Sequence, residues 1–333
     1  MNINQLKKVL PVAIEKNLNI LLKSSPGVGK SESVEKIVTD YCGYDFMICH
    51  PVMEDPIDAK GLPATFNNGT EADFIPYGNL KRMMTATKIL VVLIDDLGQA
   101  STATQAAYMQ IVHAREINGK KISPFVRFIA ATNSRKDNAG VGGLITPLLS
   151  RFAGIFEIVV DADSWIDWAT NNNMPVELIA YIKNKPSMLS TFNPTKEIEN
   201  FACPRTIANL GKWINSGIID LEVWTGCVGQ QFSIEFYAFY QMVKKIGNLP
   251  AQIMLDPKGS RIDLSPDLLY FVLIALNNRA TDTNKFKTVM EYIARIPLEF
   301  QAFALKLITS KNPRFMETNE FIAWNVKNQG IIQ

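Results

Sequence analysis

A glycine-rich loop stands between a short apolar run and a segment with helical periodicity, and its residue types suit phosphate binding. In such loops the backbone N–H groups wrap the β- and γ-phosphates of a nucleoside triphosphate, a lysine reaches them and a hydroxyl faces Mg²⁺. The strict pattern G-x-x-x-x-G-K-[ST] begins with glycine, whereas this chain has Ser24, a change expected to alter only the turn. The predicted phosphate-binding residues are Ser25, Pro26, Gly27, Val28, Gly29, Lys30 and Ser31.

Two adjacent carboxylates follow an apolar run at residues 89–94 and form a second candidate for chemistry. This is the Walker B form, in which the first acid holds Mg²⁺ through water and the second orients the attacking water. Asp95 and Asp96 are predicted to take these two parts. The alternative is a buried strand that ends in a solvated acidic turn, which we favour less because both acids directly follow six apolar residues.

Three further polar residues become candidates for the same site because of their order along the chain. Asn133 ends the run 128–133 and is expected to reach between the two strands described above, where it would help to position water. Arg151 precedes an expected fifth strand, and Arg205 stands at a predicted helix start. Each of them alone is more typical of a turn or of a solvated surface.

The elements that must position these residues form an α/β pattern. Strands are expected at residues 18–22, 46–49, 89–94, 126–131 and 155–160. The connections are long enough for crossover helices, and runs buried on both faces suit a parallel sheet, so a three-layer domain is predicted. Asn68-Gly69 is a turn signal for a small hairpin between the second and third strands.

Beyond residue 161 the apolar residues recur at helical spacing, and the rest of the chain is predicted to be helical. We expect a nucleotide-binding core at 1–160, a helical lid at 161–258 and a helical extension of unknown role at 259–333. The helices expected in the extension span 266–277, 285–294, 298–308 and 317–326.

The composition excludes several classes of protein. The chain has 333 residues, and 34 basic against 32 acidic residues leave a net charge of +2, which disfavours a nucleic-acid partner without excluding it. Its longest apolar runs have six and nine residues, whereas a membrane span needs about 20, and no secretory leader is expected. The four cysteines form no CxxC pair and only two histidines are present, so no zinc site is expected. We expect the cysteines to be free, as in a cytoplasmic protein.

In this order, the motifs resemble those of AAA+ ATPases, and within that group those of the MoxR type. Further local matches over residues 18–215 are 55–63, Gln99-Ala100, Ala139-Gly140, 165–169 and 201–205. The resemblance implies ATP and Mg²⁺ as ligands, with Asn133 as sensor 1, Arg151 as an arginine finger acting in trans, and Arg205 as sensor 2. It also implies a ring, commonly a hexamer, that remodels or activates a protein client as a chaperone does. MoxR-type proteins often act with a partner that carries a von Willebrand factor type A domain.

One departure from the family bears on the activity. Asp96 replaces the usual glutamate and is one methylene shorter, so hydrolysis is expected to be slow. Three hypotheses follow: a client-remodelling ATPase, which we favour; an ATP-gated assembly or adaptor module with little turnover; and, disfavoured by the near-neutral charge, a DNA-directed motor.

Overall fold

The computed structural model describes residues 1–134, 143–193 and 198–328. These residues form two compact units. The first comprises Met1–Asp161 with a short segment that starts at Phe192, and the second comprises Ala162–Thr191 and the described residues after position 197.

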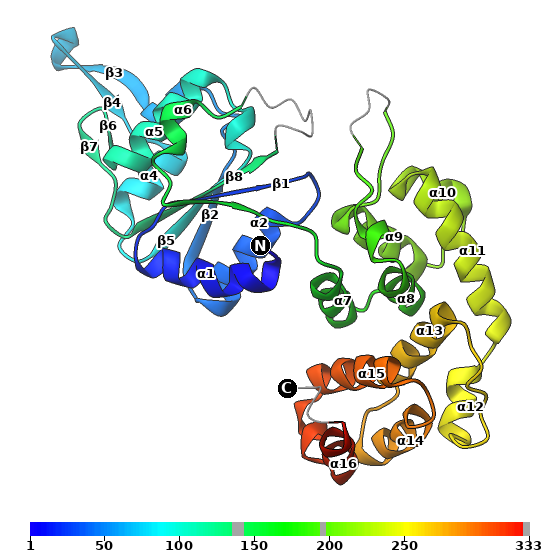
Figure 1. Ribbon diagram of the computed structural model, residues 1–333. Helices are drawn as coiled ribbons and strands as arrows, with labels where there is room; N and C mark the ends of the chain where they lie inside the picture. The colour runs from blue at the N-terminus through cyan, green and yellow to red at the C-terminus, as the bar shows by residue number, and fades with distance from the viewer. Residues whose placement is uncertain (135–142, 194–197, 329–333) are drawn as a thin grey trace. The chain divides into compact units, whose positions relative to one another are not determined.

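The first unit is built on a five-stranded parallel sheet with strand order β2-β5-β8-β1-β9 (Figure 1). Its strands are β1 (Ile20–Ser24), β2 (Asp45–Cys49), β5 (Leu90–Ile94), β8 (Val126–Asn133) and β9 (Gly154–Glu157). Every residue of the interior strand β5 is buried, because helices cover both faces of the sheet.

All five predicted strands differ from those observed by one to three residues at an end, and two of these differences have a clear cause. The first begins at Ile20 because Leu18 still belongs to the turn that ends the preceding helix, where its N–H donates to the carbonyl of Ala13. The last ends at Glu157 rather than at residue 160 because it pairs only with β1, which stops at Ser24. Its pairing partner therefore runs out.

The residues of each strand alternate between two apolar layers. On one face α1 (Ile3–Glu15), α2 (Lys30–Lys36) and a π-helix (Ile37–Tyr41) pack against Val91 and Leu93 of β5. On the other face Leu90, Val92 and Ile94 pack under helices α3 (Pro56–Lys60), α4 (Gly78–Thr85), α5 (Thr102–Ala114) and α6 (Thr146–Leu149). The predicted three-layer arrangement follows from this alternation.

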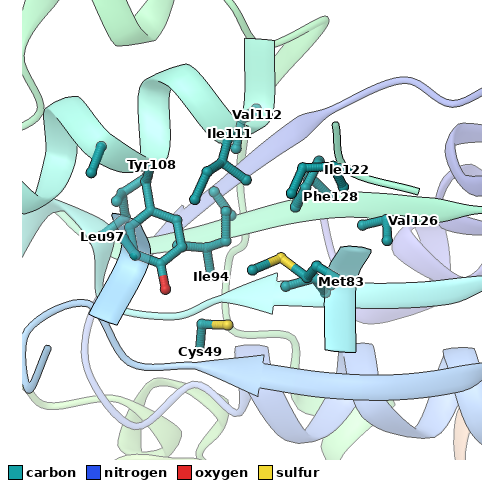
Figure 2. Packing of buried hydrophobic residues seen from close by; sticks show 14 of the residues in the cluster. Cys49, Met83, Ile94, Leu97, Tyr108, Ile111, Val112, Ile122, Val126 and Phe128 are labelled. Atoms are coloured by element: carbon teal, nitrogen blue, oxygen red, sulfur yellow. The ribbon is translucent and has the colours of Figure 1, made fainter. Parts of the chain in front are cut away.

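Figure 2 shows the second of these layers, where Cys49 and the ring of Tyr108 lie over the end of β5. Burial raises the pKa of the Cys49 thiol to about 12, so this cysteine stays protonated and packs as an apolar residue. All four cysteines are free.

Two small hairpins accompany the sheet. Strands β3 (Leu62–Phe66) and β4 (Glu71–Ile75) pair antiparallel around a turn at Asn67–Gly69, as predicted, and the hairpin projects from the first unit (Figure 1). The second, β6 (Glu116–Ile117) with β7 (Lys120–Lys121), was not predicted, although Asn118-Gly119 carries the same turn signal and both residues have positive φ. Lys120 pairs with Asp73 at 2.7 Å and so joins the two hairpins.

The described part of the second unit is helical, as predicted. Its α-helices are α7 (Ala162–Asn171), α8 (Val176–Asn184), α9 (Pro204–Asn215), α10 (Leu221–Val228), α11 (Gln230–Ile246), α12 (Leu249–Leu255), α13 (Pro266–Asn277), α14 (Thr283–Ile293), α15 (Leu298–Lys311) and α16 (Asn319–Lys327). Tyr181 packs edge-on against Phe232 with 5.3 Å between ring centroids, and Trp224 stacks on Phe236 at 5.1 Å. The aromatic residues of α11 therefore belong to the core.

The fold class expected from the sequence is confirmed as far as its architecture goes: a three-layer α/β core with a parallel sheet, followed by a helical region. No helix among the described residues is long and apolar enough to cross a membrane. The boundary proposed at residues 258–259 stays a prediction.

Candidate functional site

The chemically interesting residues of the first unit meet at one edge of the sheet. Strand β8 lies between β1 and β5, and all three run parallel. Ser24 at the end of β1 is level with Asn133 at the end of β8. Because the carboxyl ends of parallel strands share an edge, the loop 25–31, the acidic pair and Asn133 lie together there.

The glycine-rich loop has the backbone that its sequence requires. Gly27 and Gly29 adopt φ of 75° and 88°, the left-handed region that glycine enters without steric cost. Val28 between them is buried in the core and anchors the loop. Gly29 caps α2 without a side-chain hydrogen bond, so the first N–H groups of the helix remain the donors that helices offer to anions.

Lys30 is held inside this edge. Its side chain is 7% exposed, and its ammonium donates to Ser24 Oγ at 2.8 Å and to Asn133 Oδ1 at 3.0 Å. A buried lysine is expected only where polar partners compensate for its desolvation. The side chain thus stands between the loop strand and the strand that ends in Asn133.

The contact of Ser24 with Lys30 corrects our expectation that Ser24 would alter only the turn. Ser24 is the last residue of β1, and its hydroxyl is directed at the ammonium six positions further along the chain. The sequence did contain a signal for this contact, because Ser24 brings a hydroxyl to a position where phosphate loops usually have glycine.

Ser31 and Asp95 are brought together as a pair of oxygen ligands suited to Mg²⁺. Ser31 Oγ donates to Asp95 Oδ2 at 2.5 Å. Mg²⁺ prefers oxygen ligands and keeps several waters, so one hydroxyl with one adjacent carboxylate fits the ion when substrate phosphates complete the shell. Among the described residues, no group of three or more His, Cys, Asp or Glu side chains is placed to hold a metal without such help.

Asp96 occupies an uncommon backbone conformation. Its φ of 54° and ψ of 31° lie in the left-handed region, and Asn133 Nδ2 donates to its Oδ1 at 3.3 Å. Residues other than glycine stay in this region only when their surroundings enforce it, and such residues cluster at functional sites. Apolar periodicity does not report φ, so this feature was missed.

The strain at Asp96 leads to a prediction about stability. The free energy of unfolding of Asp96→Gly is expected to be about 0.5 to 1 kcal/mol higher than that of Asp96→Ala. Alanine has a Cβ, which is strained in the left-handed region, and glycine has none. Urea unfolding of the two variants gives this difference. In the control, Ala106→Gly on the exposed face of right-handed helix α5 should lower stability. Equal stabilities of the two Asp96 variants would contradict the prediction.

The two predicted arginines lie elsewhere. Arg151 follows α6 and donates through Nη1 to the carbonyl of Pro147. Two residues later, the N–H of Ala153 donates to the carbonyl of Asn19 at 2.7 Å, which places this segment where β1 begins. Arg151 therefore lies at the amino edge of the sheet, opposite the loop.

Arg205 belongs to the second unit, where it is exposed as the second residue of α9. Pro204 before it occupies the first position of the helix, which suits a residue without an N–H. Of the local matches quoted above, Ala139-Gly140 lies outside the described residues.

Comparison with known proteins gives only distant likenesses. No family model and no curated protein matches the chain. Among solved structures, it is similar to a point mutant of RuvB from Thermotoga maritima, with 15% identity, 77% of this chain and 76% of that chain covered, and a TM-score of 0.45. It is also similar to NtrX from Brucella abortus, with 14% identity, coverage of 91% and 67%, and a TM-score of 0.38.

Proposed function

We propose that this chain is an AAA+ ATPase that binds ATP with Mg²⁺ and hydrolyses it. One observation carries the proposal. Lys30, Asn133 and Asp96 are linked by hydrogen bonds at the same sheet edge as the glycine-rich loop and the Ser31–Asp95 pair. A cation, an oxygen pair for a metal and a carboxylate for water are the groups that phosphoryl transfer to water requires.

Each residue of the site has a distinct part in this proposal. Gly27, Val28 and Gly29 present backbone N–H groups to the β- and γ-phosphates, and Lys30 places its ammonium against them. Ser31 and Asp95 would hold Mg²⁺, which would supply positive charge against the phosphates. Asp96 accepts a proton from the attacking water, and Asn133, which donates to Asp96, helps to orient that water.

Arg151 supports a ring assembly. It lies at the amino edge of the sheet, and the five residues of β1 at roughly 3.3 Å each separate that edge from the loop. An arginine so placed is badly positioned for the γ-phosphate of its own subunit. We therefore propose that it serves the site of a neighbouring copy, within a closed ring that is a hexamer in the resembling family, and that Arg205 acts as sensor 2 from the helical lid.

The broader role that we propose is MoxR-like: a cytoplasmic ring that remodels or activates a protein client as a chaperone does, together with a partner that carries a von Willebrand factor type A domain. The chain motifs quoted for that resemblance support it, and the net charge of +2 favours a protein client over DNA. An ATP-gated assembly module with little turnover is the alternative. The hydrolysis rate distinguishes the two, because an assembly module would turn over little ATP. The shorter side chain of Asp96 is expected to lower that rate in either case.

The proposal predicts that Lys30→Ala weakens ATP binding by about 100-fold, since it removes charge-assisted hydrogen bonds to the phosphates. Titration calorimetry with ATP and Mg²⁺ measures the dissociation constant. The matched control is Lys23→Ala, which removes a half-buried lysine of β1 paired with Glu157 at 3.0 Å and should leave ATP binding unchanged. An unaltered ATP affinity in a folded Lys30→Ala variant would show that Lys30 does not bind the phosphates, and would contradict the proposed function.

A further inference from the structure

Ser24 is a buried polar residue at a place where phosphate loops usually have glycine. It is 1% exposed and ends β1, directly before the loop. A buried hydroxyl is retained at little cost only if its hydrogen-bonding capacity is used. Both of its capacities are used here.

The hydroxyl of Ser24 has a fixed orientation. It donates its proton to the carbonyl oxygen of Ser25 at 2.7 Å, so its lone pairs are left to accept from Lys30 Nζ at 2.8 Å. Hydrogen bonds that continue through one hydroxyl polarise each other, and an acceptor for an ammonium is strengthened by the charge. A glycine at this position has no atom that can do this.

The second acceptor of Lys30 comes from the neighbouring strand at the same level. Ser24 and Asn133 are paired positions of β1 and β8, and their side chains supply the two oxygens that receive the ammonium. Acceptors on paired strand positions are held by the sheet itself, a more rigid support than a loop. The ammonium is therefore located by the sheet before any nucleotide arrives.

We propose that Ser24 is a positioning residue that holds Lys30 ready for the β- and γ-phosphates, and so raises the affinity for ATP. This inference rests on the proposed function of the site. A long lysine side chain loses much rotamer freedom when it is fixed, and a protein that fixes it in advance does not lose that freedom on binding. Since Lys30 contacts the phosphates before and during reaction, Ser24 acts on binding rather than on the chemical step.

The test compares Ser24→Ala, which removes only the hydroxyl, with Ser24→Gly, which restores the usual loop residue. Both variants are expected to raise the dissociation constant for ATP and ADP about tenfold, while kcat at saturating ATP stays within about twofold of wild type. Ser33→Ala in α2 removes a nearby hydroxyl that the site does not use and should change neither quantity. Thermal unfolding confirms that each variant is folded.

Two results would overturn the inference. The first is wild-type ATP affinity in both Ser24 variants, which would show that the hydroxyl does not position Lys30. The second is an unchanged affinity with a lowered kcat, which would place Ser24 in the chemical step. Failure of the proposed function is separate, because it appears as an unaltered ATP affinity in Lys30→Ala.

Discussion

Arg151→Ala is expected to lower ATP turnover about 10³-fold while ATP affinity stays close to wild type. An arginine that reaches the γ-phosphate stabilises the charge of the transferring group and is worth roughly 10³ to 10⁵ in rate. Because this arginine would act mainly on the charge that develops in the transition state, its loss should disturb nucleotide binding little. Steady-state hydrolysis and calorimetry with ATP measure the two quantities.

Mixing two inactive variants tests whether Arg151 acts across subunits. Arg151→Ala keeps an intact site, and Asp96→Asn keeps an intact arginine. In a ring built from both in equal amounts, about a quarter of the head-to-tail interfaces join the intact halves and should be active. The control Arg82→Ala removes an exposed arginine of α4 and should leave turnover unchanged.

Turnover at the wild-type rate in Arg151→Ala would remove this residue from catalysis. A mixture that stays inactive although both variants assemble would contradict action in trans, since every ring of mixed composition contains intact pairs.

Asp96→Asn is expected to bind ATP as tightly as wild type and to hydrolyse it about 10²- to 10⁴-fold more slowly. An amide cannot take the proton of the attacking water, and general-base catalysis contributes a factor of this size. The substitution is otherwise mild. Asparagine tolerates the left-handed backbone seen at position 96, and its carbonyl oxygen can still accept from Asn133.

The control for this substitution is Asp45→Asn, at a half-buried aspartate of β2 that pairs with Lys88 at 3.2 Å. It should leave turnover unchanged. If Asp96→Asn hydrolyses ATP at the wild-type rate, the group that activates water is another one, and the slow turnover expected from the shorter side chain of Asp96 loses its basis.

Much of the first unit could be predicted because apolar periodicity reports burial directly. Residues 89–94 are apolar throughout, and the strand found there is buried on both faces. The turn signal at Asn68-Gly69 was equally direct, since asparagine and glycine are the residues that accept positive φ. Asn133 was expected to reach between the strands that precede the loop and the acidic pair, and it ends β8, which lies between β1 and β5.

What could not be predicted depends on side-chain direction and on backbone detail. The contact between Ser24 and Lys30 joins a strand end to a helix start, and spacing along the chain does not say which way either side chain points. The left-handed conformation of Asp96 leaves no trace in a pattern of apolar residues. No role could be predicted for residues 259–333, because no motif among them suggests a ligand.

The most direct test of the central claim is steady-state ATP hydrolysis by the wild-type chain with Mg²⁺, beside Asp96→Asn and Arg151→Ala, with oligomer mass determined with and without ATP. We predict that wild type turns over at least 100-fold faster than either variant while all three bind ATP. If wild-type turnover is no higher than that of the variants and ATP still drives assembly, the chain is an ATP-gated assembly module and not the ATPase proposed here.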